Sequence, residues 1–576
     1  MSKRENRKFL IKVQAVKIVF YPLLVVLDKV GLMGKASRYA EKITRLIGIE
    51  KSLNSMVQFH DFASCFKGGF RNTPFGHRRV LITSFLGVNS NFTLFELLLA
   101  RYYSGIGLEP VLVVCNSALG ICQRENVIRN RRFNPMFCHE CWNGYREIEK
   151  ETGIRIIYLK NIITPDIRER LDNAFRQIDG VNTHDEARAY CFEEIPVGEL
   201  SYKSVLRYFL KGSLSGTKNE LVIFRRFLQS TVVTGILFGE ILKSDNAPEK
   251  VIIPNGTLAL EAVLRNQCHR KGIPYMTFEN YMGEDTIIYK KNDEVMKLDW
   301  DEEMETRWRH NLTKEEIAAA ADRFFSELRI GRHKYAILNR EQDRRKVNPY
   351  GRFVCAFTNL NFDTAVIGKH TIFSNMEDWL VSLTDFWAAT VSELKLVIRV
   401  HPAEVKMRSG TGEFMGDILR ERVKSDKIII IDSTEPVNSY DLMEYMEYGL
   451  IYSSTIGLEI AHLGKTCVVA GKPYFLNKPF VITPSDQFDY FNTLSMLNRG
   501  ELRFVPDYDN LNRLVYHIFN VRLKKLKGIK LFSLNTEKMT GLKDPEELIG
   551  DNIDFFEEFE EEFSNDPPPG YRPSTV

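Results

Sequence analysis

Short apolar runs alternate with segments of helical spacing over most of the chain. "RVLITSF" at 79–85 is followed by the amphipathic segment 92–107, and "EPVLVVC" at 109–115 is the next apolar run. "GIRIIYL" at 153–159 and "KVIIPN" at 250–255 repeat the pattern. Strands that alternate with helices form parallel sheets. We therefore predict a first Rossmann-like domain over residues 71–310, with a helical insertion at about 165–245.

A second alternation of the same kind follows. "RFVCAF", "LKLVIRV", "KIIIID", "YGLIYS" and "KTCVVAG" are its apolar runs, and they predict a second Rossmann-like domain over residues 349–535. Residues 311–348 between the domains hold a helix, with Thr313 and Glu316 in capping-box spacing, and a charged linker. Two such domains with a cleft between them make the GT-B arrangement of α/β proteins, which hosts several functions.

The two ends of the chain differ from this body. Residues 1–70 form a predicted basic helical extension, in which residues 1–50 carry eleven Lys or Arg against four acids. Its apolar run at 18–27 is about half the length that a membrane-spanning helix needs. We expect it either to lie on an anionic membrane surface or to pack on the protein. Residues 536–576 are acidic, Phe-containing and finally Pro-rich, which predicts a partly disordered tail.

Composition narrows the class of protein. The chain has 576 residues, 44% hydrophobic and 27% charged, with a net charge of +3. This balance is typical of a globular protein and argues against a nucleic-acid partner, which would favour a strongly basic surface. No cleavage pattern of a secretory signal is visible near the N-terminus. We expect a cytoplasmic protein, with peripheral attachment to the cytoplasmic membrane as an option.

The nine cysteines do not suggest a disulfide framework in a chain of this length. Cys115, Cys122, Cys138 and Cys141 cluster in the sequence, and the last two have the two-residue gap that allows both thiolates to bind one metal. A structural zinc site is one interpretation of this group. Reduced cysteines without metal are the other.

Candidate chemistry appears where the predicted strands end, since parallel α/β sheets bind ligands beyond the carboxyl ends of their strands. In "IRVHPAE", Pro402 ends the strand and fixes the direction of His401. An imidazole at this position can hold a phosphate oxygen, either charged or as a neutral donor. Arg399 falls on the same side of the strand and is predicted to support that charge or to pair with Glu404.

A hydroxyl-rich segment ends another predicted strand of the second domain. Ser453, Ser454 and Thr455 precede a helix whose free N–H groups favour a phosphate, although simple N-capping is the alternative role. Gly457 would allow close approach of a ligand, and Glu459 could accept from ribose hydroxyls. Together with His401, these residues predict a nucleotide-phosphate site.

The same residues carry a resemblance to a known family. "IRVHPAE", the Asn438-containing loop "IDSTEPVNSYDLM" and "YSSTIGLEIAHLGKTCVVAGKPYF" resemble the capsule polysaccharide biosynthesis proteins, which are GT-B glycosyltransferases of surface polysaccharide assembly. The likeness extends to "KPFVITPSDQFDYF" and "TNLNFDTAVIGKHTIFSNMEDWL". It covers the second domain well and the first domain mainly by the order of elements.

The resemblance implies a substrate class. Bacterial sialyltransferases and Kdo transferases have similar His-Pro and Ser/Thr motifs and use CMP-activated sugars, and their motifs hold the nucleotide phosphate. Glycerophosphotransferases of teichoic-acid synthesis have a similar pair and use CDP-linked donors. The resemblance thus places a cytidine nucleotide on His401, Ser453, Ser454 and Thr455, and we expect Asn438 to contact the same nucleotide. It also implies a glycan or lipid-linked acceptor, which we expect to meet the donor from the first, acceptor-side domain. No catalytic metal is expected, because hydroxyls, N–H groups and His401 can offset the phosphate charge.

A transferase of this kind also needs a base for the acceptor hydroxyl. Glu279 ends a first-domain strand and is the predicted base. The sialyltransferase acid motif places glycine after an acidic pair, whereas here Gly283 precedes Glu284 and Asp285, so Glu279 is preferred. Further polar residues follow predicted strands and are expected either to line the cleft or to serve turns and caps: Asn89, Ser90, Asn91, Asn359, Asn361 and Asp363. A nucleotide-sugar epimerase and a non-catalytic nucleotide-binding scaffold remain the alternatives.

Overall fold

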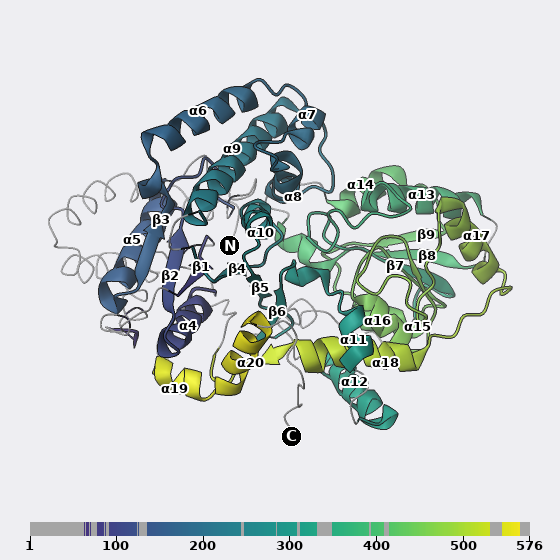
Figure 1. Cartoon of the computed structure of the whole chain (residues 1–576). Helices are drawn as coiled ribbons and strands as arrows, with labels where there is room; N and C mark the ends of the chain where they lie inside the picture. Colours follow the sequence, from purple (N-terminus) through teal and green to yellow (C-terminus); the bar gives the residue numbers. More distant parts are fainter. Residues whose placement is uncertain are drawn as a thin grey trace, which may run out of the picture.

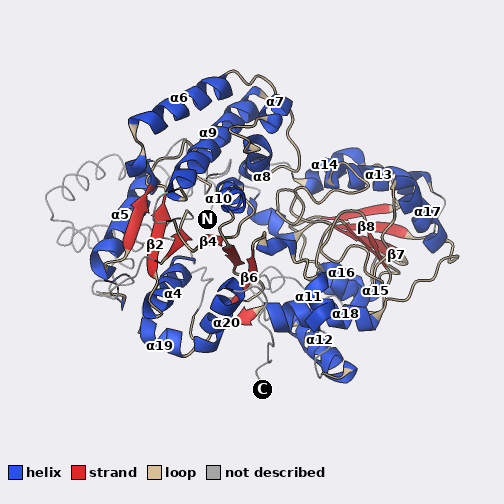
Figure 2. Cartoon of the chain, in the orientation of Figure 1, coloured by secondary structure: helices blue, strands red, loops and turns tan. Residues whose placement is uncertain are grey.

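The computed structural model describes residues 63, 65–67, 70, 78–85, 87, 92–123, 125, 135–243, 247–283, 285–307, 312–330, 348–390, 393–407, 414–529 and 544–564. Statements below refer to these residues. They form two α/β domains, each built around its own sheet (Figure 1, Figure 2). The basic extension predicted for residues 1–70 lies almost wholly outside the described residues.

The first domain is built on a seven-stranded sheet of order β12-β6-β5-β4-β1-β2-β3. The strands from β3 to β5 are parallel, whereas β6 runs antiparallel to β5 and to β12. The predicted apolar runs supply its parallel part, because branched side chains buried on both faces favour such strands. The strands are β1 Arg79–Thr83, β2 Glu109–Val114, β3 Arg155–Tyr158, β4 Lys250–Pro254, β5 Tyr275–Glu279, β6 Thr286–Lys291 and β12 Lys524–Lys525.

Helices cover both faces of this sheet. Alternate residues of β1 and β2 enter two separate cores, one beneath α4 and α5 and the other beneath the predicted helical insertion and α10. The insertion is confirmed as α6 to α9. The helices are α4 Phe92–Gly105, α5 Pro135–Thr152, α6 Pro165–Asp179, α7 His184–Ala189, α8 Val197–Phe209, α9 Lys218–Ile241 and α10 Ala259–Lys271, with the short η1 Leu159–Ile162 and η2 Val295–Lys297. α11 Asp301–Arg307 follows, and its Met304 enters a core shared with the second domain.

The long apolar helix α9 belongs to the interior of the first domain. Within the described part of the chain it is the one helix that is long and apolar enough to cross a membrane by length and composition, yet 72% of its apolar window is buried in the protein. It packs against α8, α10 and α6. Its hydrophobicity is accounted for by this packing.

The second domain contains a five-stranded parallel sheet of order β11-β10-β7-β8-β9. Its strands are the five predicted apolar runs: β7 Phe353–Phe357, β8 Lys395–Arg399, β9 Ile428–Ile431, β10 Gly449–Ile451 and β11 Cys467–Val469. α12 Lys314–Arg329 precedes the sheet, and the predicted capping box of Thr313 and Glu316 is confirmed. The other helices are α13 Met376–Ala389, η4 Pro402–Met407, α14 Met415–Arg422, α15 Ser439–Tyr445, α16 Ile456–His462, α17 Gln487–Asn498, α18 Tyr508–Tyr516 and η5 His517–Arg522.

Both domains share one strand order. Numbered within its own domain, each parallel sheet reads 3-2-1-4-5, so the predicted pair of Rossmann-like domains is confirmed. In this order the first strand lies between the second and the fourth, and the connections leave in opposite directions there. That switch point falls between β1 and β4 in the first domain and between β7 and β10 in the second. The carboxyl ends of these strands are where a ligand is expected.

The C-terminal region returns to the first domain, which corrects two predicted boundaries. β12 joins the first sheet beside β6, so the second domain ends before residue 524 and not at 535. The tail predicted as partly disordered instead contains α19 Pro545–Gly550 and α20 Ile553–Ser564, drawn in yellow in Figure 1. Four phenylalanines of α20 enter the first core, because its acidic residues alternate with an apolar stripe at helical spacing. The sequence beyond residue 564 lies outside the described residues.

Acidic residues of α20 pair with one basic residue of β4 and one of η5. Lys250 lies 2.5 Å from Glu560, and the buried guanidinium of Arg522 donates to both oxygens of Glu562 at 2.8 and 2.9 Å. These bonds explain how a strongly acidic segment docks on the protein.

The two domains are in direct contact near their strand ends. The ring of Tyr281, which follows β5, stacks on Phe519 of η5 at a centroid distance of 6.3 Å. Gly212, which follows α8, has its Cα against the side-chain amide of Asn361 in the second domain, so that any Cβ there would clash with it. The loops after α8 and after β7 therefore meet at the junction of the domains.

Candidate functional site

The switch point of the second domain is held together by hydrogen bonds between its loops. The backbone N–H of Ser453, after β10, donates to Oδ1 of Asn359, after β7, at 3.4 Å. The hydroxyl of Ser453 donates to the carbonyl oxygen of Ala365 at 2.5 Å. Asn359 and Ser453 are both buried. The structure thus brings these two predicted residues together, and both fix the loop that covers the strand ends.

His401 is positioned by a residue that the sequence analysis did not select. Its backbone N–H donates to Oγ1 of Thr358 at 2.9 Å, and the N–H of Ala403 donates to its Nδ1 at 3.2 Å. Because Nδ1 accepts this bond, the neutral ring carries its proton on Nε2. Burial lowers the pKa of His401 to about 4, and Arg399 lowers it as well, while Asp363 raises it. At neutral pH the side chain is therefore a neutral Nε2–H donor, one of the two forms predicted.

Asp363 interacts electrostatically with residues of both domains. Its exposed carboxylate raises the pKa of His401 and also that of Tyr281, which is two residues beyond Glu279. Its Oδ1 accepts from the backbone N–H of Ala365 at 3.1 Å. The carboxyl ends of β5 and β8 therefore approach one another around this predicted cleft residue.

Arg399 is almost fully buried, and its environment differs from the predicted pairing with Glu404. Its Nη1 donates to the carbonyl oxygen of Asp432 at 2.7 Å, while Nε and Nη2 have no hydrogen-bond partner among the described residues. Glu404 accepts instead from the backbone N–H of Gly416 at 3.4 Å. A buried guanidinium with unused donors is costly, so this strand end favours an anion.

The hydroxyl segment before α16 divides into residues with different roles. Ser454 Oγ accepts from the backbone N–H of Ile456 at 3.4 Å, which is local turn chemistry. Thr455 is exposed at the N-cap position, and its side chain makes no capping hydrogen bond. The hydroxyl of Thr455 is therefore available to a ligand beside the buried Ser453.

Gly457 and Glu459 of α16 were predicted to serve ligand binding, and both lie among protein side chains. A Cβ on Gly457 would lie 2.6 Å from Cδ1 of Ile451 and 2.9 Å from Phe475, so this glycine serves helix–strand packing and not the approach of a ligand. Burial raises the pKa of Glu459 to about 7, and a hydrogen bond with Tyr440 opposes that shift. The ribose-binding role of Glu459 remains a prediction.

Asn438 is a helix cap in the structure. Its Oδ1 accepts from the backbone N–H of Tyr440 at 2.8 Å at the start of α15. This is the usual function of asparagine at such a position. Its predicted contact with the donor nucleotide is not tested by this geometry.

The predicted base Glu279 is held at the carboxyl end of β5. Its Oε2 accepts from Nδ2 of Asn255 at 2.7 Å and its Oε1 from the backbone N–H of Asn280 at 3.0 Å. Asn255 adopts a left-handed conformation with φ of 60° at the end of β4, one residue before Gly256 with φ of 84°. This tight turn directs the Asn255 amide toward Glu279 and fixes the carboxylate at the first domain's ligand-binding edge.

A second carboxylate near this edge escaped the sequence analysis. Glu261, in the first turn of α10, is fully buried and accepts from Nε2 of Gln123 at 2.6 Å. Burial raises its pKa to about 7, and the carboxylate of Glu279 also raises it. Its other oxygen has no partner among the described residues. The position within an ordinary amphipathic pattern gave no signal of this environment.

Glu96 of α4 forms a comparable buried carboxyl beside β1. It accepts from the hydroxyl of Ser84, which also contacts the hydroxyl of Tyr145 at 2.7 Å. Burial raises the pKa of Glu96 to about 8. The carboxyl is therefore largely protonated at neutral pH and stabilises the interior of the first domain as a neutral group.

The remaining predicted cleft residues have separate outcomes. Asn361 is 6% exposed and packs on Gly212 across the domain junction. Asp285 lies 3.6 Å from Lys525 of β12, so it belongs to the edge of the first sheet. Asn89, Ser90, Asn91 and Glu284 lie outside the described residues.

The four clustered cysteines approach one another in the first domain. Cys115 is half-buried, and burial raises its pKa, with further contributions from Cys141, Cys122 and Cys138. In the described part of the chain no group of three or more side chains of His, Cys, Asp or Glu is arranged to hold a metal ion. All four cysteines are unbridged, and the structural zinc site remains a prediction.

Comparison with known proteins gives only distant likenesses. No protein-family model matches this chain, and no curated protein matches it. The solved structures that resemble it include two KpsC proteins of Thermosulfurimonas dismutans, a beta Kdo 2,4 transferase and a beta Kdo 2,7 transferase. The first has 14% identity and a TM-score of 0.31 and covers 49% of this chain and 82% of its own. The second has 13% identity and a TM-score of 0.31 and covers 55% and 88%.

A UDP-GlcNAc 2-epimerase of Methanocaldococcus jannaschii, solved with UDP-GlcNAc and UDP, is also similar. Its identity is 11% and its TM-score 0.26, with 77% of this chain and 99% of the epimerase covered. Likenesses of this size carry no argument about the activity of this chain. Its architecture, two Rossmann-like domains of GT-B type, follows from its own strand order.

Proposed function

We propose that this protein is a glycosyltransferase that moves a sugar from a nucleotide-sugar donor to a surface polysaccharide or lipid-linked glycan acceptor. The observation that carries the proposal is the set of polar groups at the switch point of the second domain. Thr358 and Asn359 after β7, His401 after β8 and Ser453 after β10 are joined by hydrogen bonds at one edge of the sheet. Three strand ends thereby present polar groups to one place.

The donor nucleotide is proposed to bind at this edge through its phosphate. The neutral Nε2–H of His401 and the free hydroxyl of Thr455 can each donate to phosphate oxygens. The unused Nε and Nη2 donors of Arg399 add a positive charge close to His401. These groups would stabilise the negative charge that develops on the departing nucleotide. We expect no catalytic metal to be required.

The acceptor hydroxyl is proposed to be activated from the first domain. Glu279 is anchored by Asn255 and Asn280 and lies two residues before Tyr281, which shares Asp363 as an electrostatic neighbour with His401. A carboxylate facing the donor across the junction can accept the proton as the acceptor oxygen attacks. The acceptor would then leave with the transferred sugar, and the nucleotide would leave with its phosphate.

We propose a cytidine nucleotide as the donor carrier and a position at the cytoplasmic face of the membrane. The first rests on the motif resemblance of the His401 and Ser453 segments. The second rests on the excess of basic residues in 1–50, since a basic segment with one apolar run can bind an anionic surface.

Nucleotide release tests the proposed reaction. The purified protein is incubated with CMP-, CDP- and UDP-linked sugars, with and without a membrane glycolipid extract as acceptor source. A transferase releases nucleotide faster when acceptor is present. Equal release without acceptor, or an altered sugar still linked to its nucleotide, would contradict the proposal and favour an epimerase or a hydrolase.

A further inference from the structure

Three lysines from separate segments meet at the junction of the domains. Lys203 lies on α8 of the first domain, Lys369 in the loop between β7 and α13, and Lys472 directly after β11. The N–H of Lys472 donates to the carbonyl oxygen of Lys369 at 2.8 Å. The Cε atom of Lys203 lies 3.8 Å from the position that a Cβ would take on Gly368. We name these three residues the junction lysines.

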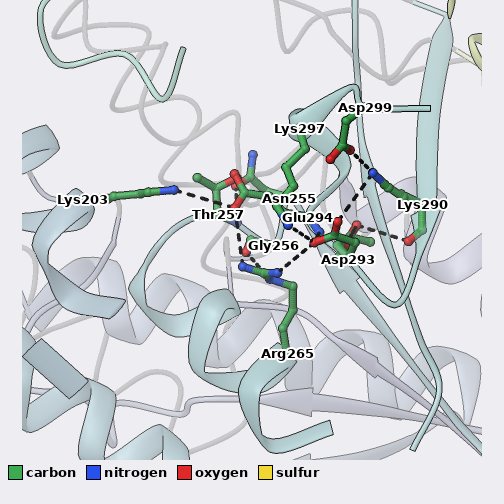
Figure 3. Close-up of polar contacts among 11 residues, drawn as sticks. Lys203, Asn255, Gly256, Thr257, Arg265, Lys290, Asp293, Glu294, Lys297 and Asp299 are labelled. Atoms are coloured by element: carbon green, nitrogen blue, oxygen red, sulfur yellow. Dashed lines mark hydrogen bonds and ion pairs between the residues drawn. The ribbon is translucent and has the colours of Figure 1, made fainter. Parts of the chain in front are cut away.

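The acidic groups around the junction lysines do not balance them. Lys203 lies 3.7 Å from Glu294, but Glu294 also accepts from Thr257 at 2.8 Å and lies 3.5 Å from Arg265 (Figure 3). Lys369 and Lys472 have no ion pair within 4 Å among the described residues. Lys369 is half-buried and Lys472 is exposed. A half-buried cation such as Lys369 without a close partner is energetically unfavourable, which favours an anionic ligand.

Asp293 and Asp299, the other acidic residues nearby, form ion pairs with other basic residues. Asp293 lies 2.6 Å from Lys297 and 3.6 Å from Lys290, and Asp299 pairs with Lys290 (Figure 3). The whole group contains six basic side chains against three acidic ones: Lys203, Arg265, Lys290, Lys297, Lys369 and Lys472 against Asp293, Glu294 and Asp299. The group as a whole therefore carries an excess of positive charge.

The electrostatic neighbourhood of Lys369 is consistent with this imbalance. Burial lowers the pKa of Lys369, and Lys203 and Lys472 lower it further, while Glu294 and Asp299 act in the opposite direction. Lys369 therefore experiences repulsion from both Lys203 and Lys472. An anion between them would relieve this repulsion.

We propose that the junction lysines form an anion site that binds a phosphate or carboxylate group of the substrate held between the two domains. The inference deepens the proposed function, because Lys369 shares the loop of Asn359 and Asp363, which covers the candidate donor site. Both domains contribute to the anion site, so an anionic substrate draws Lys203 of the first domain toward Lys369 and Lys472 of the second. Substrates with a second negative charge are thereby selected over neutral ones.

Calorimetric titration of the full chain with inorganic pyrophosphate and with malonate tests the proposal. Wild-type protein is compared with Lys369→Gln/Lys472→Gln and with Lys395→Gln, whose exposed side chain lies at the amino-terminal end of β8, opposite the carboxyl end that leads to His401. We expect at least one probe to bind, and its affinity to fall tenfold or more in the double variant and not in Lys395→Gln. Pyrophosphate binding alone would identify phosphate as the group, whereas comparable malonate binding would identify carboxylate.

The charge-preserving variant Lys369→Arg/Lys472→Arg guards against a folding artefact, since it should retain most of the affinity. Absence of binding to wild type, or equal binding to wild type and the glutamine variant, would overturn the anion site. A different result would overturn the proposed function: nucleotides that do not bind, or nucleotide binding that is unchanged when His401 is replaced. A nucleotide that binds through His401 with no effect of the junction lysines would sink this inference alone.

Discussion

Oγ1 of Thr358 accepts the backbone N–H of His401 at 2.9 Å, which joins the carboxyl ends of β7 and β8. In return, the N–H of Thr358 donates to the carbonyl oxygen of Arg399 at 3.1 Å. This pair of bonds holds the histidine in place beside the switch point. The candidate site is therefore supported by neighbouring strands and does not depend on one loop.

Replacing Thr358 with valine should loosen this support. The substitution leaves the His401 N–H without its acceptor in a buried place, which costs about 1–3 kcal/mol of the free energy of unfolding. Urea denaturation of Thr358→Val measures the loss, and Thr358→Ser, which keeps the hydroxyl, is the control. Equal stability of the three proteins would show that this bond contributes nothing.

The pH dependence of stability should carry a contribution from His401. Its folded pKa of about 4 is lower than the ordinary value of 6.5, so the unfolded chain binds the proton first as the pH falls. Stability from this group is complete above pH 6.5 and is lost between about pH 6.5 and 4, by about 3 kcal/mol.

Comparing variants isolates this contribution. His401→Asn keeps an acceptor for the Ala403 N–H but has no titration, so it should lose less stability than wild type between pH 7 and 4. The exposed His269 of α10 supplies the control His269→Asn, which should behave like wild type. Parallel pH profiles of wild type and His401→Asn in denaturant titrations would refute the assignment.

Glu279→Gln should separate catalysis from donor binding. The amide keeps the shape of the side chain but cannot accept a proton, so we expect the transfer rate to fall by about 10²–10⁴. The thermal shift caused by the nucleotide should stay unchanged, because that ligand is proposed to bind the second domain. A fully active Glu279→Gln protein would exclude Glu279 as the base and direct attention to Glu261.

Metal removal gives a further expectation. Hydroxyls, N–H groups and the Arg399 charge are proposed to offset the phosphate charge, so EDTA should leave the transfer rate unchanged. Loss of activity that magnesium restores would contradict this part of the account.

The docking of α20 should be essential to the first domain. Phe556 is fully buried and stacks on Tyr102 at 5.3 Å, so Phe556→Ala should cost about 3–5 kcal/mol of the free energy of unfolding. Phe488 is 83% exposed, and Phe488→Ala is the matched control, with an expected change of about 0.5 kcal/mol or less. A small effect of Phe556→Ala in thermal unfolding would contradict the docked helix.

The sequence predicted the parallel strands correctly, because buried branched residues followed by polar turns define them locally. It missed β6 and β12, since "TIIYKK" and a two-residue strand carry little pattern of their own. It also predicted a partly disordered end where α20 folds, because the acidic helix pairs with Lys250, 310 positions before Glu560, and with Arg522, 40 positions before Glu562. Such long-range pairs leave no local signal.

In the candidate site, too, some residues could be predicted from local sequence and others could not. His401 and Ser453 were recognisable at strand ends, and Asn359 and Asp363 followed another strand. Thr358 was overlooked because one threonine after a strand is unremarkable until the neighbouring strand is known. Gly457 was misread because only tertiary packing reveals Ile451 and Phe475 against its Cα. Local pattern identifies strand ends, but the partners across them come from the sheet order.

The central claim is that the His401 strand end binds the phosphate of a nucleotide. The most direct measurement is a thermal-shift panel of CMP, CDP, UMP, UDP and GDP on wild-type protein and on His401→Ala, since a ligand that binds the native state raises its melting temperature. The account predicts a shift with CMP or CDP that disappears in the variant. No shift with any nucleotide, or the same shift in both proteins, would contradict it.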